Sequence, residues 1–451
     1  MILIIINFLL ITSLLYLRKK DIKVAIIQSY LLTTGITLVF TEILSTFNLV
    51  TFSGLLISWS TLAVLLIFWR IRKYGSQKVF NLKEIVGHIS TRRSDFAPEI
   101  LMIFGIVLIL VITLVIALFA PPNNGDSMTY HMARIVHWIQ QRNVDFFTTS
   151  ISRQNHSMPL AEYMILNLQL LSKSDRYANL VQWSAFVVLV LSVTQVANFL
   201  GVSKRGQLVS GFFMATIPMA ILQSTSTQND IVVSLFCLLF VYFLLRLIKY
   251  GSWLAVFYAG LSLGLALLTK GTAYIFCAAT GITLGITGLI LKIRERKIRL
   301  VLNLIAVILL ALTLNSGYYQ RNINLYSHPL STETDRVTID EFSLAGFYSN
   351  LIRNGSMHLA VPFPPANRLL TQVIEFLLQG QINSSATTFP GSEFEIQYLI
   401  NEDESGNFLH FVLLITSLFF ISRKRTTKDD YIPFYFFSVT ASILLFSALL
   451  K

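Results

Sequence analysis

The long, uninterrupted apolar segments of this chain constrain its fold more than any other feature. Each is long enough to cross a hydrocarbon core of roughly 30 Å, which takes about 20 residues of helix. Backbone groups in lipid must bond internally, so such segments form helices or a closed barrel. Continuous rather than alternating apolar residues argue against a barrel. Only 13% of the residues are charged, against about 25% in a soluble domain. The sequence therefore predicts an all-α, polytopic transmembrane helix bundle.

Hydropathy predicts about a dozen membrane-spanning helices. Their expected ranges are 2–17, 24–42, 51–69, 99–120, 179–199, 206–222, 231–248, 252–268, 272–291, 300–318, 408–421 and 431–450. The first range has no basic residues before it and is followed by Arg18, Lys19 and Lys20. We therefore expect a retained helix with its N-terminus outside, and not a cleaved signal.

The basic residues fix the expected orientation. One set of loops contains 24 of the 35 basic residues and 7 of the 23 acidic ones, whereas the other set has 11 and 16. The basic residues of these loops lie at 18–23, 70–93, 204–205, 246–249, 292–299 and 423–428. Because basic loops stay on the cytoplasmic side, these loops are expected there. The net charge of +12 then reflects membrane orientation, and no nucleic acid is expected as a partner.

Two long segments remain on the outer side, at about 121–178 and 319–407. The first begins with a Pro-Pro helix stop and an Asn-Asn-Gly turn, followed by Asp126. A helix is predicted over Ser127–Gln141, with an apolar face at helical spacing and Trp138 suited to a membrane interface. We expect this helix to lie on the outer membrane surface. Asp126 fits either a helix N-cap or a general base, and the two roles are compatible.

Several other charged residues lie at tight outer turns. Asn229 and Asp230 precede an apolar segment, where an N-cap is the plainer interpretation. Lys270 lies between two apolar segments and opposes the orientation trend, which marks a functional candidate, although a snorkelling lysine with Gly271 as C-cap also fits. Arg321 follows an outer helix end and is either functional or an interfacial anchor.

Carboxylates and isolated cations on one face suit a reaction in which an acceptor loses a proton while a phosphate leaves. Arginine binds phosphate oxygens bidentately and lysine acts as a point charge. Cations at headgroup depth favour a lipid phosphate as substrate. The sequence leaves the cofactor open, and a divalent metal with it, although no ligand spacing among the acids supports a metal site.

The second outer segment predicts two surface helices, near 342–360 and 367–379, split by prolines. It then becomes acidic, with Glu393, Glu395 and residues 402–404. We expect it either to cover the site and bind the acceptor or to be solvated surface; for any single acid the solvated interpretation is the simpler one.

The order and common sidedness of four short motifs resemble the GT-C superfamily of polytopic glycosyltransferases. The resemblance is strongest to the bacterial family 39 type, which is related to protein O-mannosyltransferases and the lipid A aminoarabinose transferase. It covers roughly residues 99–325. The motifs are Asn124-Gly125-Asp126-Ser127-Met128-Thr129-Tyr130-His131, Thr227-Gln228-Asn229-Asp230, Thr269-Lys270-Gly271 and Gly317-Tyr318-Tyr319-Gln320-Arg321-Asn322.

The resemblance implies inverting transfer of a sugar from a polyprenyl-phosphate donor, on the extracytoplasmic face of the plasma (inner) membrane. The acceptor would be a glycan, lipid or protein hydroxyl. By position, Asp126 corresponds to the catalytic base and Arg153 to a basic residue that meets the donor phosphate. Two features depart from the usual pattern: Asp126 has no adjacent second acid, and three predicted helices precede residue 99.

Combining motifs and charges, we predict a role for eight residues. Asp126 is the catalytic base; Lys270, Arg321 and Arg153 bind the donor phosphate; Asp230, Asn229, His131 and Tyr319 orient the acceptor or these cations. The expected divisions are a three-helix extension and cytoplasmic loop (1–98), a catalytic core (99–325) containing the outer loop 121–178, and a C-terminal part (326–451) with an outer loop and two spans.

Three other functions stay open. A transporter or flippase for lipid-linked glycans needs charged residues along a path through the bundle, whereas the charges here gather outside. A surface-polysaccharide ligase or polymerase uses a lipid-pyrophosphate glycan. A non-catalytic scaffold predicts little effect of substituting Asp126 or Lys270.

Overall fold

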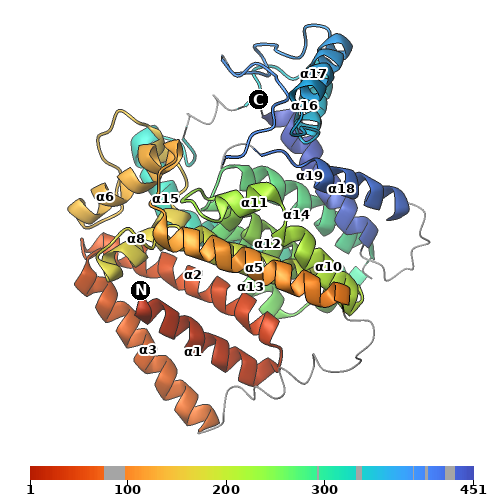
Figure 1. The fold of residues 1–451 in the computed structure, drawn as a ribbon. Coiled ribbons are helices and arrows are strands. Elements are labelled where there is room, and N and C mark those ends of the chain that lie inside the picture. The colour runs from red at the N-terminus through yellow and green to blue at the C-terminus, as the bar shows by residue number, and fades with distance from the viewer. Residues whose placement is uncertain are drawn as a thin grey trace.

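The structure, a computed structural model, describes residues 1–75, 97–291, 294–331, 338–389, 391–401, 405–421 and 432–450. These residues form helices and loops, with two isolated β-bridges and no β-strand (Figure 1). The basic stretches at 78–93 and 423–428 and the acids at 402–404 lie outside the described residues. The all-α prediction is confirmed.

The helices follow the predicted spans closely for most of the chain. Their bounds are α1 Ile2–Lys19, α2 Ile22–Thr46, α3 Phe52–Tyr74, α5 Ala97–Phe119, η1 Ser127–His131, α6 Met132–Gln141, α7 Arg153–His156, α8 Leu160–Ser172, α9 Leu180–Phe199, α10 Lys204–Ala215, α11 Pro218–Gln223, α12 Asp230–Tyr250, α13 Trp253–Leu267, α14 Thr272–Leu291, α15 Arg294–Tyr326, α16 Leu344–Met357, α17 Pro364–Leu378, α18 Phe408–Ile421 and α19 Ile432–Leu449.

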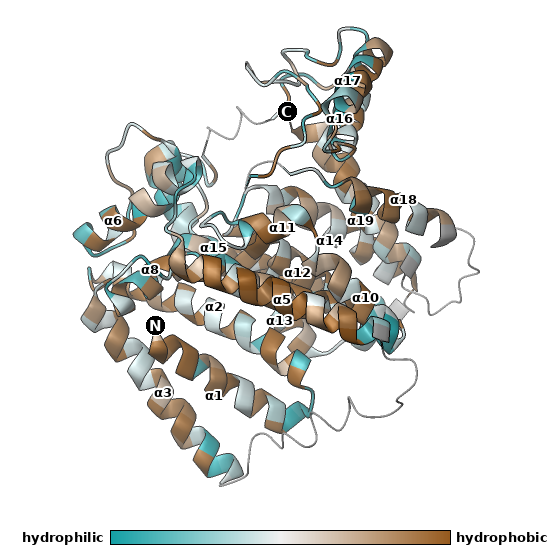
Figure 2. Ribbon diagram, viewed as in Figure 1, coloured by the Kyte–Doolittle hydropathy of each residue, from teal (hydrophilic) through white to brown (hydrophobic). Residues whose placement is uncertain are grey.

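Among the described residues, eight helices are long and apolar enough to cross a membrane, and α13, α18 and α19 contribute three shorter apolar segments. Figure 2 shows apolar residues along most of α5, with hydrophilic residues gathered toward helix ends and in the loops. This distribution is that of a multi-pass membrane protein.

Two predicted spans differ from the observed helices. The segment predicted as one helix over 206–222 is two helices, α10 and α11, because Pro218 lacks an N–H and restricts the residue before it. The helix predicted over 300–318 extends to Tyr326 as α15. Its polar end continues as helix because Arg321 finds a partner in Glu42 of α2.

Glycines allow the central helices to approach closely. A Cβ at Gly260 or Gly264 of α13 would lie within 2.8 Å of the Leu310 or Leu314 side chain of α15. Two small residues four positions apart on one helix face are a common device for tight packing in membranes. The α13–α15 pair, together with α12, forms the centre of the bundle that carries the site.

The candidate site lies at the end of the bundle opposite the basic helix ends. On α12, Asp230 is in the first turn and Lys249 in the last, and 21 helical residues span about 30 Å. Arg18 and Lys19 end α1, while Arg72 and Lys73 end α3. Asp126 follows the C-terminal end of α5 in the sequence.

Candidate active site

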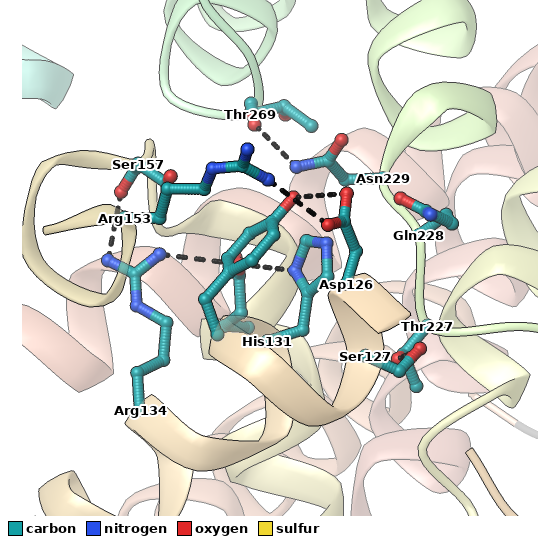
Figure 3. A network of polar contacts seen from close by, with 12 residues as sticks. Asp126, Ser127, His131, Arg134, Arg153, Ser157, Thr227, Gln228, Asn229 and Thr269 are labelled. Atoms are coloured by element: carbon teal, nitrogen blue, oxygen red, sulfur yellow. Dashed lines mark hydrogen bonds and ion pairs between the residues drawn. The ribbon is translucent and has the colours of Figure 1, made fainter. Parts of the chain in front are cut away.

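Asp126 lies in the first turn of the helix that opens the first large loop, but it does not cap that helix. The cap is Asn124, whose Oδ1 accepts a hydrogen bond of 2.7 Å from the Ser127 amide. The Asp126 carboxylate instead accepts hydrogen bonds from Arg153 Nη1 at 3.2 Å and from the Tyr130 hydroxyl at 3.3 Å (Figure 3). The Asp126 side chain is 36% exposed, so a substrate can reach it.

A second ion pair joins Asp230 to Lys270. Lys270 Nζ lies 2.5 Å from Asp230 Oδ1, and the two side chains are 35% and 37% exposed. Asp230 makes no capping hydrogen bond, and Asn229, at the N-cap position of α12, makes none either. Lys270 therefore does not simply snorkel, and Asp230 does not simply cap a helix.

Two contacts bring the ion pairs into one cluster. The Thr227 hydroxyl donates to Ser127 Oγ at 2.6 Å, which ties the turn before α12 to the residue after Asp126. Asn229 Nδ2 donates to the Thr269 carbonyl at 3.2 Å, which ties the same turn to the α13–α14 turn (Figure 3). Residues 126, 153, 229, 230 and 270 therefore share one cluster.

Tyr130 contacts Asp126 and is close enough to Asp230 for the charge of that acid to affect its hydroxyl. Burial raises the pKa of its hydroxyl, and the negative charges of Asp126, Glu162 and Asp230 add to the increase. The hydroxyl therefore stays protonated and donates to Asp126, which holds the carboxylate in a fixed orientation.

A buried cluster of charged side chains supports the helix formed by η1 and α6 on the side that faces the protein. His131 Nδ1 lies 2.7 Å from Glu162 Oε1, and Arg134 Nη1 donates to the same oxygen at 3.3 Å; all three side chains are buried. Arg134 also donates to the Ser157 carbonyl at 2.8 Å and lies 4.6 Å from the Trp138 ring.

This cluster shows which side of the helix over 127–141 the protein covers; that the helix lies on the membrane surface stays a prediction. His131, Arg134 and Trp138 face the protein, while Met128 and Val136 are exposed. The physical reason is Glu162 of α8, a buried carboxylate that can be satisfied only by turning the basic side chains inward. The His131 ring therefore packs against the Tyr130 ring, with the two ring centroids 4.0 Å apart, and its Nδ1 contacts Glu162.

The pKa of Glu162 predicts how the stability of the first outer loop depends on pH. Burial alone would raise the pKa of Glu162, but Arg134 and His131 outweigh it and lower that pKa below its usual 4.5. The stabilisation is then complete above the pKa of the unfolded chain and is lost as the pH falls through the lower pKa of the folded protein.

We expect the thermal midpoint in detergent to fall as the pH is lowered below about 4.5, and Glu162→Gln to be less stable at neutral pH with a flatter acid dependence. Glu375→Gln, at an exposed position of α17, is the control. A Glu162→Gln variant with unchanged midpoint and unchanged acid dependence would contradict this role.

Arg321 and Tyr319 lie at the outer end of α15 and have partners of their own. Arg321 donates through both terminal nitrogens to Glu42 of α2, at 2.8 and 2.7 Å. The Tyr319 hydroxyl lies 2.8 Å from that of Tyr274 in the first turn of α14. That Arg321 binds donor phosphate therefore stays a prediction, and Glu42 is a charged residue that the sequence interpretation did not single out.

The second outer segment forms the two predicted helices, as α16 and α17, over a small core of its own. Glu393 and Glu395 are exposed, which agrees with solvated surface for these two acids. In the described part of the chain, no group of three or more His, Cys, Asp or Glu side chains is arranged to hold a metal ion.

Taken together, the fold and the cluster define a multi-pass membrane protein with paired acids and cations at one end of its bundle. The family of dolichyl-phosphate-mannose-protein mannosyltransferases matches residues 155–317, from α7 to the outer part of α15. The match covers a little over a third of the chain and supports the resemblance to the polytopic glycosyltransferases of the GT-C superfamily. The matched range contains Glu162, Asp230 and Lys270. No curated protein and no solved structure matches the chain.

Proposed function

We propose that this protein transfers a sugar, with inversion, from a polyprenyl-phosphate donor to an acceptor hydroxyl on the extracytoplasmic face of the plasma membrane. One observation carries the proposal. Two accessible ion pairs, Asp126–Arg153 and Asp230–Lys270, lie in one cluster at the end of the bundle opposite its basic helix ends. Such a cluster offers both a base for the acceptor and cations for the leaving phosphate.

In the proposed step, the acceptor oxygen attacks the anomeric carbon as the bond between that carbon and the phosphate oxygen breaks. Asp126 takes the acceptor proton, and Tyr130 and Arg153 hold its carboxylate. Lys270 and Arg153 stabilise the negative charge that develops on the polyprenyl phosphate. Asp230 holds Lys270, and Asn229 ties both turns together.

A groove in the bundle suits the donor's hydrocarbon chain. A cavity of about 490 Å³ lies elsewhere, between α1, α2 and α9, but a cavity of about 330 Å³ opens beside Asp230 itself. Below Asp230 it is lined mainly by apolar side chains of α12, α14 and α19, including Val233, Leu238 and Phe276. A phosphate at Lys270 would thus continue into an apolar channel.

Filling this groove should weaken donor use. Ser234 is exposed on α12 and lines the cavity, so Ser234→Trp would fill it without removing core packing. Losing contact with two or more methylene groups, at about 0.8 kcal/mol each, should raise the donor KM about tenfold or more. Ser417→Trp, on an exposed face of α18, is the matched control. An unchanged donor KM in Ser234→Trp would remove the groove from the proposal.

The donor class is the direct test of the proposed function. Purified protein should transfer sugar from a polyprenyl-monophosphate donor and release the polyprenyl phosphate. Use of only a lipid-pyrophosphate glycan would favour a ligase or polymerase instead. Movement of the lipid-linked sugar across vesicles without transfer would favour a flippase.

A further inference from the structure

The three helices that precede the core, α1 to α3, place one carboxylate, that of Glu42, at the outer end of the core. Glu42 of α2 accepts two hydrogen bonds from Arg321 of α15, at 2.8 and 2.7 Å, and one of 2.9 Å from the Tyr163 hydroxyl of α8. Arg321 in turn donates to the Tyr163 oxygen at 2.6 Å. Two parallel bonds between a guanidinium and a carboxylate fix orientation as well as distance.

The backbone of α15 is shaped for this contact. A Cβ at Gly317, one turn before Arg321, would lie 2.5 Å from Glu42 Oε2. This distance is shorter than any real carbon contact, so a side chain at position 317 would displace the carboxylate. The close approach is evidence for the Glu42 contact that does not depend on the hydrogen bonds.

The end of α15 that contacts Glu42 also contacts two segments of the candidate site. The Tyr318 hydroxyl donates to the His156 carbonyl at 2.5 Å, in the short helix that begins with Arg153. The Tyr319 hydroxyl contacts Tyr274 at 2.8 Å, in the first turn after Lys270. One helix end therefore touches both segments that carry the proposed phosphate-binding cations.

We infer that Glu42 is a positioning residue of the active site, through which the N-terminal helices become a working part of the transferase. It acts through Arg321, whose side chain is only 12% exposed and has its positive charge balanced by Glu42. The inference rests on the proposed function, because the groups it positions are Arg153 and Lys270.

Glu42→Gln keeps the size of the side chain and removes its charge. We expect kcat/KM for the donor to fall by about 10- to 100-fold, mainly through KM, because small displacements of positioning groups have effects of this size. The shape of the pH profile should stay unchanged, since the base is a different residue. Activity is compared per folded molecule, measured by size-exclusion chromatography, with Glu375→Gln on the surface of α17 as control.

Two further variants separate positioning from folding. Gly317→Ala keeps both charges but forces Glu42 away, so it should reproduce the rise in donor KM. In a double-mutant cycle, Glu42→Gln with Arg321→Gln should lose no more activity than the worse single variant, because both remove one contact. Additive losses, or an unchanged donor KM in folded Glu42→Gln and Gly317→Ala, would overturn the inference.

These outcomes are distinct from failure of the proposed function. If Asp126→Asn abolishes transfer while Glu42→Gln and Gly317→Ala keep the normal donor KM, only the positioning role of Glu42 is excluded. If Asp126→Asn keeps full activity, the proposed chemistry falls whatever the Glu42 variants do.

Discussion

Asp126→Asn should lower sugar transfer by about 10²- to 10⁴-fold, the range that a general base contributes. The amide has the size of the carboxylate, and its one oxygen can still accept a hydrogen bond from Tyr130 or from Arg153, so the loop should keep its structure. What it cannot do is take the acceptor proton. The measurement is turnover of a polyprenyl-phosphate sugar by purified variant and wild-type protein at equal folded concentration.

Asp175→Asn is the matched control for this prediction. Asp175 is an exposed acid near the end of the same loop, and its side chain lies outside the cluster. We expect normal transfer from it. Full activity in Asp126→Asn, with donor binding intact, would exclude Asp126 as the base and with it the proposed mechanism.

Lys270→Ala is expected to have the next largest effect, a loss of about 10²- to 10³-fold in transfer. The substitution removes a positive charge that balances the developing phosphate charge, and it also leaves Asp230 without the partner 2.5 Å away. Both effects disfavour an anionic leaving group. The measurement is kcat and KM with a polyprenyl-phosphate sugar, together with equilibrium binding of the polyprenyl phosphate alone.

Two variants distinguish the effects of the lost lysine charge. Lys270→Ala combined with Asp230→Asn removes the repulsion from an unpaired acid, so it should recover binding in part but not turnover. Lys173→Ala removes a cation of the first outer loop that lies over the Phe52 ring and away from the cluster, and it should be normal. Wild-type kcat and donor binding in Lys270→Ala would show that this lysine is structural.

Most of the fold follows from the sequence because hydropathy, caps and charges act locally. Asp21, Thr51, Ser203 and Ser252 each accept a hydrogen bond from a backbone amide of the helix that follows, where the sequence changes from polar to apolar. The break before Pro218 also had a local signal, which the continuous hydropathy of the segment outweighed. The extension of α15 had none, since it depends on partners from distant helices.

The candidate site shows the same difference between residues with a local sequence signal and residues whose partners are distant in the sequence. Asp126, Asp230 and Lys270 were predictable because isolated charges beside apolar segments need a reason. The pairing of Glu42 with Arg321 was not, because 279 positions separate the two residues and the packing of α2 against helices distant in sequence, such as α8 and α13, brings the carboxylate there. A lone acid inside a predicted span was nevertheless a signal for Glu42.

The surface helix shows where periodicity fails. Spacing identified the two faces of the helix over 127–141, but it did not show which face the protein covers. Glu162 decided this by drawing His131 and Arg134 inward. A buried acid on one element thus determines the orientation of another, and such pairing is invisible when each segment is considered alone.

The most direct test of the central claim is an experimental density map of the protein bound to a polyprenyl phosphate. We predict a phosphate within hydrogen-bonding distance of Lys270 and Arg153, a hydrocarbon chain in the groove between α12, α14 and α19, and Asp126 facing the place of the transferred sugar. A phosphate bound at the basic end of the bundle, or held by none of these side chains, would contradict the account.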